Sequence, residues 1–210
     1  MNFYNEMMDA NGGVRAHYKR YDEWLKATPP ERIARKRAEA DLAFHRVGIT
    51  FAVYGEESGK ERLIPFDIIP RIIPSTEWKA LQSGLRQRVK ALNMFLDDIY
   101  HDQEILKAGK IPAEQVLNNA QYRPDMKGVD VPGGIYAHIA GVDVVRAGAG
   151  ELYVLEDNLR VPSGVSYMLE DRKMMMRLFP DLFANNKVAP VQHYPYMLLE
   201  KLRAVAPKGV

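Results

Sequence analysis

The sequence contains no cysteine, which excludes disulfide bonds and any zinc site built on thiolates. Its five histidines do not have the close spacing of metal ligands. No apolar run reaches the roughly 18 residues that a transmembrane helix needs, and the first residues lack the pattern of a signal peptide. We therefore expect a cytoplasmic protein with no membrane partner.

The sequence also lacks a strong excess of either charge, with 29 basic and 27 acidic residues and a net charge of +2. This balance gives no general reason to expect a nucleic-acid partner. One basic run, from Arg32 to Arg37, could bind nucleic acid or phosphate. Glu39 and Asp41 follow Arg35 and Arg37 by four residues, which favours a solvated, ion-paired helix face instead.

Hydrophobic periodicity predicts a mixture of helices and strands in a chain long enough for one large or two small domains. The longest predicted helix, residues 76–100, carries an apolar stripe at intervals of three and four. Thr28 followed by Pro29 predicts a helix start, and Pro180 predicts a helix end. We expect further helices at residues 15–26, 31–47, 113–119, 165–178 and 196–206, and strands at 49–54, 62–64, 135–145 and 152–155.

The stretch with the most chemical content is a predicted β-hairpin. Residues 135–145 and 152–155 are β-rich runs, and a short turn rich in small residues, 147–150, joins them. The second run ends in Glu156, Asp157 and Asn158. Since side chains alternate along a strand, Glu156 and Asn158 share one face and Asp157 takes the other.

Asp143, on the partner strand, can lie close to Glu156 and Asn158 if the turn sets the register that way. Two carboxylates and an amide oxygen are hard donors that suit Mg²⁺. Arg146 and Arg160 flank the cluster and could hold phosphate or carboxylate oxygens. The alternative is structural, since Asp or Asn at a strand end commonly bonds the local backbone.

Beyond these physical patterns, the segments IPSTEW, RQRVKALNMFLDDIY and LEDNLRVPSGVSYMLEDR resemble the circularly permuted ATP-grasp family, relatives of glutathionylspermidine synthase. EDNLRVPSGVSYM resembles the magnesium loop of ATP-grasp ligases. The resemblance covers nearly the whole chain but only the first half of a family member. It therefore implies a fragment that is incomplete and inactive by itself.

The resemblance implies an α+β (mixed α/β) fold, with an ATP-grasp-type mixed or antiparallel sheet and packed helices. We expect a helical N-terminal segment, residues 1–47, before a partial ATP-grasp domain, residues 48–210. The implied cofactors are ATP and Mg²⁺, and the nucleotide-binding lysines are expected beyond Val210. The implied roles are metal binding by Asp143, Glu156 and Asn158, phosphate or acyl-phosphate contact by Arg160 and Arg146, and anion binding by Ser163 and Gly164 where the next helix opens.

The implied activity is an ATP-dependent carboxylate–amine ligation through an acyl phosphate, which forms an amide bond. The expected partners are small-molecule or peptide acids and amines. The sequence does not identify the acid or the amine. The alternative is a non-catalytic binding module that retains the ATP-grasp fold. An exposed sheet edge leaves open a homo-oligomer formed through that edge.

Overall fold

The computed structural model of the protein describes residues 4–48, 50–52, 61–64 and 66–207. The chain forms two compact units. Unit 1 comprises Met1–Pro74 and Ser163–His193, and unit 2 comprises Ser75–Pro162 and Tyr194–Val210. Both units contain helices and one antiparallel strand pair, so the predicted α+β fold class is confirmed. The proposed division at residue 47 stays a prediction.

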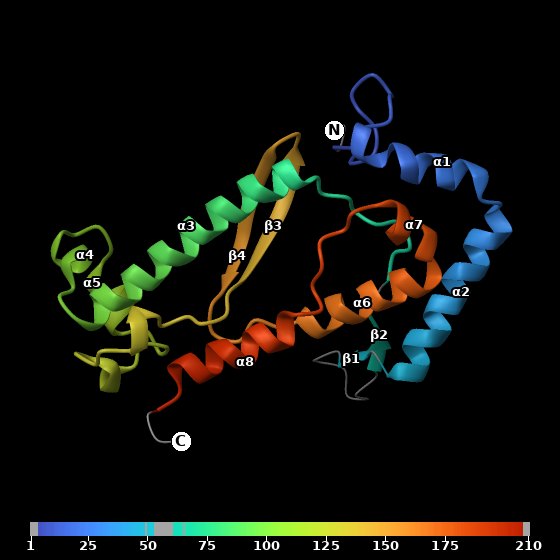
Figure 1. The fold of residues 1–210 in the computed structure, drawn as a ribbon. Helices are drawn as coiled ribbons and strands as arrows, with labels where there is room; N and C mark the ends of the chain where they lie inside the picture. Colours follow the sequence, from blue (N-terminus) through green and yellow to red (C-terminus); the bar gives the residue numbers. More distant parts are fainter. Residues whose placement is uncertain (1–3, 49, 53–60, 65, 208–210) are drawn as a thin grey trace. The chain divides into compact units, whose positions relative to one another are not determined.

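Unit 1 is built mainly from helices. Two of the predicted strands are present as β1 (Thr50–Ala52) and β2 (Glu61–Leu63), which pair antiparallel. The sequence between them, Glu56 to Lys60, has the composition of a hairpin turn and lies outside the described residues. Helix α6 ends at Leu178, where the sequence predicts its end, and it lies beside α2 (Figure 1). The helices of unit 1 are η1 (Ala16–Tyr18), α1 (Lys19–Ala27), α2 (Pro30–Val47), α6 (Val165–Leu178) and α7 (Pro180–Asn185).

Apolar side chains from α2 and α6 form the core of unit 1. Phe44 is 1% exposed and packs with Ile68, Met174 and Leu178. Phe179 meets the Trp24 ring edge-on, with ring centroids 5.2 Å apart, a favourable aromatic geometry. Burial of these side chains holds the two helices together. The apolar periodicity of each helix places them on the side that faces the other helix.

Two predicted signals in unit 1 act differently from expectation. Thr28 does not cap α2, because its hydroxyl donates to the Trp24 carbonyl at the end of α1, and Pro29 takes the cap position. Pro180 does follow the end of α6, but it also begins α7, where its missing N–H costs nothing. Both residues therefore lie at helix boundaries, as predicted. Thr28 stabilises the end of the preceding helix, and Pro180 begins the following one.

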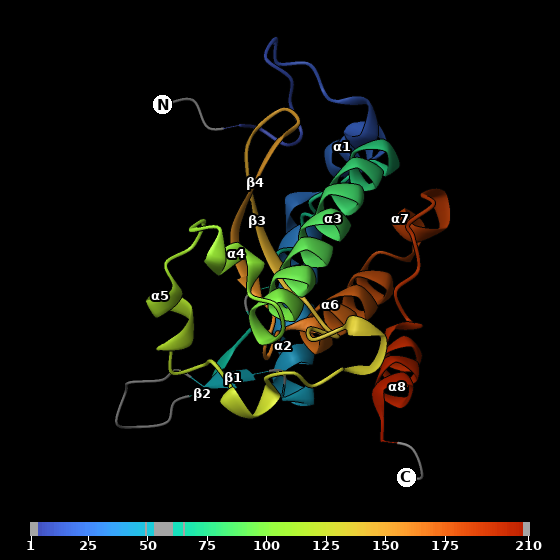
Figure 2. The ribbon, with the colours of Figure 1, turned by 90° about the vertical axis from the view of Figure 1, so that its left-hand side faces the viewer.

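Unit 2 is organised around the helix α3 (Ser75–Tyr100), which runs along the hairpin of β3 (Gly141–Gly148) and β4 (Glu151–Asn158) (Figures 1 and 2). The long helix and the hairpin are both predicted by the sequence. No described helix in either unit has both the length and the apolar character needed to cross a membrane. The shorter helices are α4 (Glu104–Lys107), α5 (Ala113–Leu117), η2 (Pro124–Met126), η3 (Pro132–Gly134) and α8 (Tyr194–Val205).

The strand predicted to start at residue 135 starts only at Gly141. The Asn93 side chain on α3 is the reason, because its Oδ1 accepts hydrogen bonds from the N–H groups of Tyr136 (2.8 Å) and Ala137 (2.9 Å). These N–H groups are therefore satisfied by a helix side chain and need no partner strand. The apolar residues before Gly141 pack near the C-terminal half of α3, where Tyr136 stacks on Tyr100.

Candidate functional site

The register of the hairpin places the predicted ligands together. Asp143 lies directly opposite Glu156, and Gly141 lies opposite Asn158. Glu156 and Asn158 are two residues apart on one strand, so all three polar side chains share one face. The proximity predicted for Asp143 and Glu156 is confirmed, whereas a metal role for them stays a prediction.

A β-bulge sets this arrangement. Val144 pairs with Val154 and Asp143 pairs with Glu156, so Leu155 is the extra residue in β4. Leu155 and Glu156 are both exposed, and Asp157 turns to the inner face. Bulges re-aim side chains within a strand. Here the bulge keeps Glu156 on the outer face of the hairpin, away from α3.

The three outer polar side chains are not engaged by the rest of the described chain. Among the described residues, Asp143, Glu156 and Asn158 have no hydrogen-bond or ion-pair partner for their side chains. Asp143 and Glu156 are also exposed. No described group of three or more His, Cys, Asp or Glu side chains is placed to hold a metal ion. A metal site at Asp143 and Glu156 would therefore need the side-chain amide oxygen of Asn158 as its third donor.

Asp157, on the inner face, has a different role. Both of its oxygens accept from Nε of Arg88 on α3, at 2.8 and 2.9 Å, and Nη2 of Arg88 lies 2.6 Å from Oδ2. This hydrogen-bonded ion pair lowers the pKa of Asp157 and raises the pKa of Arg88. The pair ties the end of β4 to the middle of α3.

Arg146 lies on the inner face as well, opposite to the face of Asp143. Its side chain is almost fully buried, and its guanidinium forms an ion pair with Glu77 near the start of α3. The two inner ion pairs therefore hold the hairpin to α3 at both ends. The structure does not bring Arg146 together with the three outer polar residues.

The hairpin also depends on two glycines. Gly150 adopts a left-handed backbone conformation with φ of 75° in the turn, which suits glycine. At Gly141 a Cβ atom would lie only 2.8 Å from Cβ of Pro162. The chain after Asn158 therefore passes close to β3, and a larger residue at Gly141 would displace it.

The other predicted residues follow β4. Arg160 is exposed, and its Nη1 donates to Oε1 of Gln121 at 3.0 Å. Ser163 and Gly164 belong to unit 1, where Gly164 occupies the cap position of α6. The Ser163 side chain has no hydrogen-bond partner among the described residues. Their role in anion binding stays a prediction.

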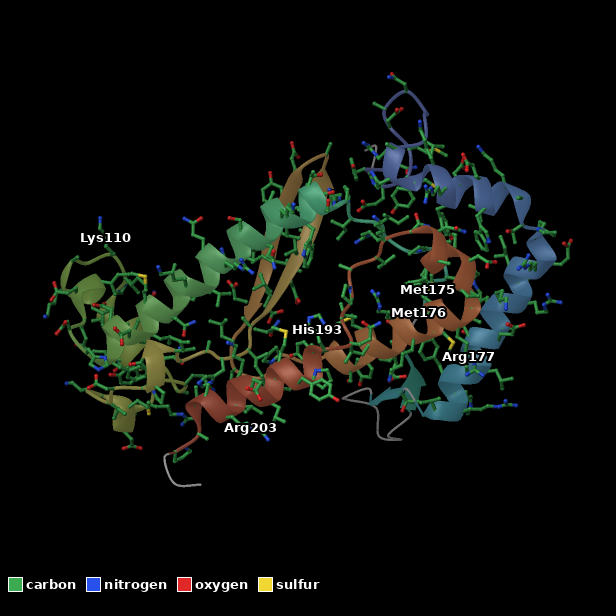
Figure 3. The ribbon with its side chains drawn as sticks, in the orientation of Figure 1. Lys110, Met175, Met176, Arg177, His193 and Arg203 are labelled. Atoms are coloured by element: carbon green, nitrogen blue, oxygen red, sulfur yellow. The ribbon has the colours of Figure 1, made fainter. Side chains whose placement is uncertain are left out.

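Three lysines of this chain, Lys110, Lys173 and Lys187, have ordinary surroundings. Lys110 projects from the segment between α4 and α5 (Figure 3). Lys173 is paired with Glu170 at 2.5 Å, and Lys187 follows α7. None of these positions identifies a nucleotide-binding lysine, so the expectation that such lysines lie beyond Val210 stays a prediction.

Sequence reasoning missed a polar cluster at the C-terminal end of α3. The Nδ1 of His101 is 2.9 Å from the Asp97 carbonyl oxygen, and its Nε2 is 3.4 Å from a carboxylate oxygen of Asp130. Tyr136 donates to Asp97 at 3.3 Å. The hydrogen bond to the Asp97 backbone and both carboxylates raise the pKa of His101. Only the i, i+4 spacing of Asp97 and His101 could have indicated this cluster.

Comparison with known proteins gives a family for most of the chain. Residues 70–210 match the family described as a circularly permuted ATP-grasp. An uncharacterized protein of Synechocystis is 45% identical over 206 residues, which cover 98% of this chain and 43% of that protein. An uncharacterized protein of Mycobacterium tuberculosis is 44% identical over 200 residues, or 95% of this chain and 36% of its own length.

A Frankia casuarinae protein provisionally named glutamate–cysteine ligase 2-2 is 38% identical over 208 residues, which cover 97% of this chain and 23% of that protein. The chain thus spans less than half the length of each of these three relatives.

Proposed function

The chain belongs to the circularly permuted ATP-grasp family, and from this premise we propose that it forms the metal-binding part of an ATP-dependent carboxylate–amine ligase. One observation carries the proposal. Asp143 lies opposite Glu156 on the outer face of the hairpin, with Asn158 two residues further along the same face. A family that uses ATP requires oxygen ligands for magnesium, and these residues offer them without competing partners.

The donor set fits magnesium. Mg²⁺ prefers hard oxygen ligands and is usually bound through one or two carboxylates, with waters and substrate phosphates completing its coordination. Asp143 and Glu156 supply the two carboxylates, and Asn158 supplies a neutral oxygen. When bound, the metal would neutralise charge on the phosphates of ATP.

The proposed reaction has two steps. An oxygen of the substrate carboxylate attacks the terminal phosphorus of ATP, and the bond between that phosphorus and ADP breaks. The amine nitrogen then attacks the carbonyl carbon of the acyl phosphate, inorganic phosphate leaves, and the nitrogen loses a proton. The relative provisionally named glutamate–cysteine ligase would, by its name, carry out a ligation of this class.

Three further groups of this chain have proposed roles. The exposed Arg160 contacts phosphate oxygens, which a guanidinium can bind through two hydrogen bonds. Ser163 and Gly164 present backbone N–H groups at the start of α6, where an anion is favoured. Arg146 can contact phosphate only after exchanging its ion pair with Glu77, so its role at the inner face is mainly to hold the hairpin to α3.

Paramagnetic line broadening by Mn²⁺ tests the metal site in this chain. We expect low concentrations of Mn²⁺ to broaden the backbone amide signals around Asp143 and Glu156 first. The variant Asp143→Asn/Glu156→Gln should lose this broadening. The matched control is Glu151→Gln, which removes an exposed carboxylate from the same hairpin. Equal broadening at many surface carboxylates, or unchanged broadening in the double variant, would contradict the site.

Ligase activity requires a test in a longer relative. We expect the Synechocystis protein, supplied with acids and amines, to release ADP and form an amide. Replacing its counterparts of Glu156 and Asn158 should abolish ADP release while leaving the circular dichroism spectrum unchanged. Wild-type turnover in those variants would refute the proposed role, and a wild-type protein with no ATP-dependent turnover would favour the binding-module alternative.

A further inference from the structure

An open groove runs along α3 on a side that the proposed ligase chemistry does not use. It has a volume of about 920 Å³ and lies between α3, the segment from Gly133 to Val142, and the end of α8. All of its lining residues belong to unit 2. We refer to it as the α3 groove.

The wall that α3 contributes is apolar and accessible. Trp78, Leu85 and Val89 line it at intervals of seven and four, which place them along one side of the helix, and Met94 lines its far edge. Trp78 is 48% exposed and Met94 is 62% exposed. Large apolar side chains that gather along an open groove mark an interaction site more often than scattered ones do.

The charge of the α3 groove has one sign. Arg86 and Lys90 on α3 and Lys201 on α8 line it, and among the described residues no aspartate or glutamate does. None of the three cations has an ion-pair partner in the described part of the chain. The ligand that fits is therefore acidic.

Two carboxylates between α3 and the hairpin are already ion-paired. Glu77 pairs with Arg146, and Asp157 pairs with Arg88. Each of these ion pairs is neutral as a unit. Asp143 and Glu156 have no such partner, but they lie on the outer face of the hairpin and do not line the groove. On α8, Glu200 pairs with Arg203.

The length of the α3 groove indicates a polypeptide ligand. Trp78 and Met94 are 16 positions apart on α3, which at 1.5 Å per residue is about 24 Å. Helix-in-groove recognition uses apolar contacts at i, i+3 or i+4 and i+7 over such a length. A single-stranded nucleic acid would need several stacked aromatic platforms, and among the described residues the α3 groove is lined by Trp78 and His138 and by no Phe or Tyr.

We propose that the α3 groove docks an acidic amphipathic helix of a partner protein. The apolar side of that helix packs on Trp78, Leu85 and Val89. Its carboxylates face Arg86, Lys90 and Lys201. This docking is independent of the metal site, because Asp143 and Glu156 lie on the outer face of the hairpin and do not line the groove.

Fluorescence anisotropy with designed 16-residue peptides tests the proposal. The probe is a labelled helix with leucines at helical spacing and glutamates between them. One control peptide has the same composition in scrambled order, and another replaces each glutamate by lysine. We expect saturable binding of the probe alone, weakened by added salt because the charge contacts are screened.

The variants Trp78→Ala and Arg86→Glu/Lys90→Glu should each weaken binding of the probe at least about tenfold, the loss that removal of one central contact commonly causes. The matched control is Lys110→Glu, which changes a cation outside the groove and should leave binding unchanged (Figure 3). Circular dichroism confirms that each variant is folded.

Four results would overturn the proposal. Equal binding of the scrambled peptide would show charge attraction without a groove, and tighter binding of an oligonucleotide would identify nucleic acid as the ligand. Light scattering that shows a dimer broken by Trp78→Ala would mean that a second copy covers the groove. Failure of the Synechocystis relative to bind the probe would mean that its own additional chain fills the groove.

Discussion

Replacing Asn93 by alanine should uncouple the segment before β3 from α3. Asn93 is 9% exposed, and its Oδ1 accepts from the N–H groups of Tyr136 and Ala137 while its Nδ2 donates to the Val89 carbonyl at 3.1 Å. Alanine leaves both N–H groups without an acceptor. Each unsatisfied group costs about 1–3 kcal/mol when buried, and since Tyr136 is only half-buried we expect a total of about 2–4 kcal/mol.

Amide hydrogen exchange measured by NMR is the appropriate assay, since two compact units need not unfold in one transition. We expect the protection of the Tyr136 and Ala137 amides to fall at least about tenfold in Asn93→Ala, since about 1.4 kcal/mol corresponds to tenfold in an opening equilibrium. Asn93→Asp keeps the oxygen acceptor and should retain most of the protection. Gln87→Ala, at an exposed position of α3, should retain all of it.

Unchanged protection of both amides in Asn93→Ala would refute the role of these two hydrogen bonds. An equal loss of protection in Asn93→Asp would also refute it, because the effect would then come from packing around the side chain and not from the two hydrogen bonds.

Three other predictions concern stability. The pKa of Asp157 in the folded protein lies below the ordinary value of 3.8, so its ion pair stabilises the fold above pH 3.8 and stops doing so as the pH falls through the folded pKa. Asp157→Asn should therefore abolish this part of the acid dependence of thermal unfolding. The pKa of His101 is raised above 6.5 in the folded protein, so its stabilising contribution is complete below pH 6.5 and is lost as the pH rises through the folded pKa. His101→Gln should therefore make the exchange protection of the Gly128 amide, which donates to the Tyr100 carbonyl, independent of pH in that range. Phe44→Ala should lower the unfolding free energy of unit 1 by about 3–5 kcal/mol in denaturant titration, whereas Leu42→Ala on the exposed side of α2 should lower it by less than about 1 kcal/mol, and equal losses would contradict the assigned core.

Local patterns predicted most of the elements. The apolar intervals along residues 76–100 predicted the bounds of α3 to within one residue. The short turn of small residues between the two β-rich runs predicted the hairpin. The face shared by Glu156 and Asn158 followed from the alternation of side chains. Each of these inferences depends on residues close together in the chain, where geometry is set by the backbone alone.

Features that depend on distant residues were not predictable in this way. Residues 135–140 have a β-rich composition, but Asn93, more than forty positions away, satisfies two of their N–H groups. The pairing of Arg88 with Asp157 likewise joins residues 69 positions apart. Arg146 was predicted beside the outer polar residues because it flanks them in sequence, yet alternation along β3 places it on the other face.

The bulge at Leu155 has a consequence for how this hairpin can change in length. β4 carries one more residue than the pairing with β3 requires, so deletion of Leu155 would leave Glu156 opposite Asp143 and Asp157 opposite Val142. A second deletion in the same strand would remove a residue that is paired with β3. It would reverse the alternation of side chains, so that Glu156 would point toward α3 and Asp157 toward solvent. Over evolutionary time β4 can therefore lose one residue without exchanging its two faces, but not two.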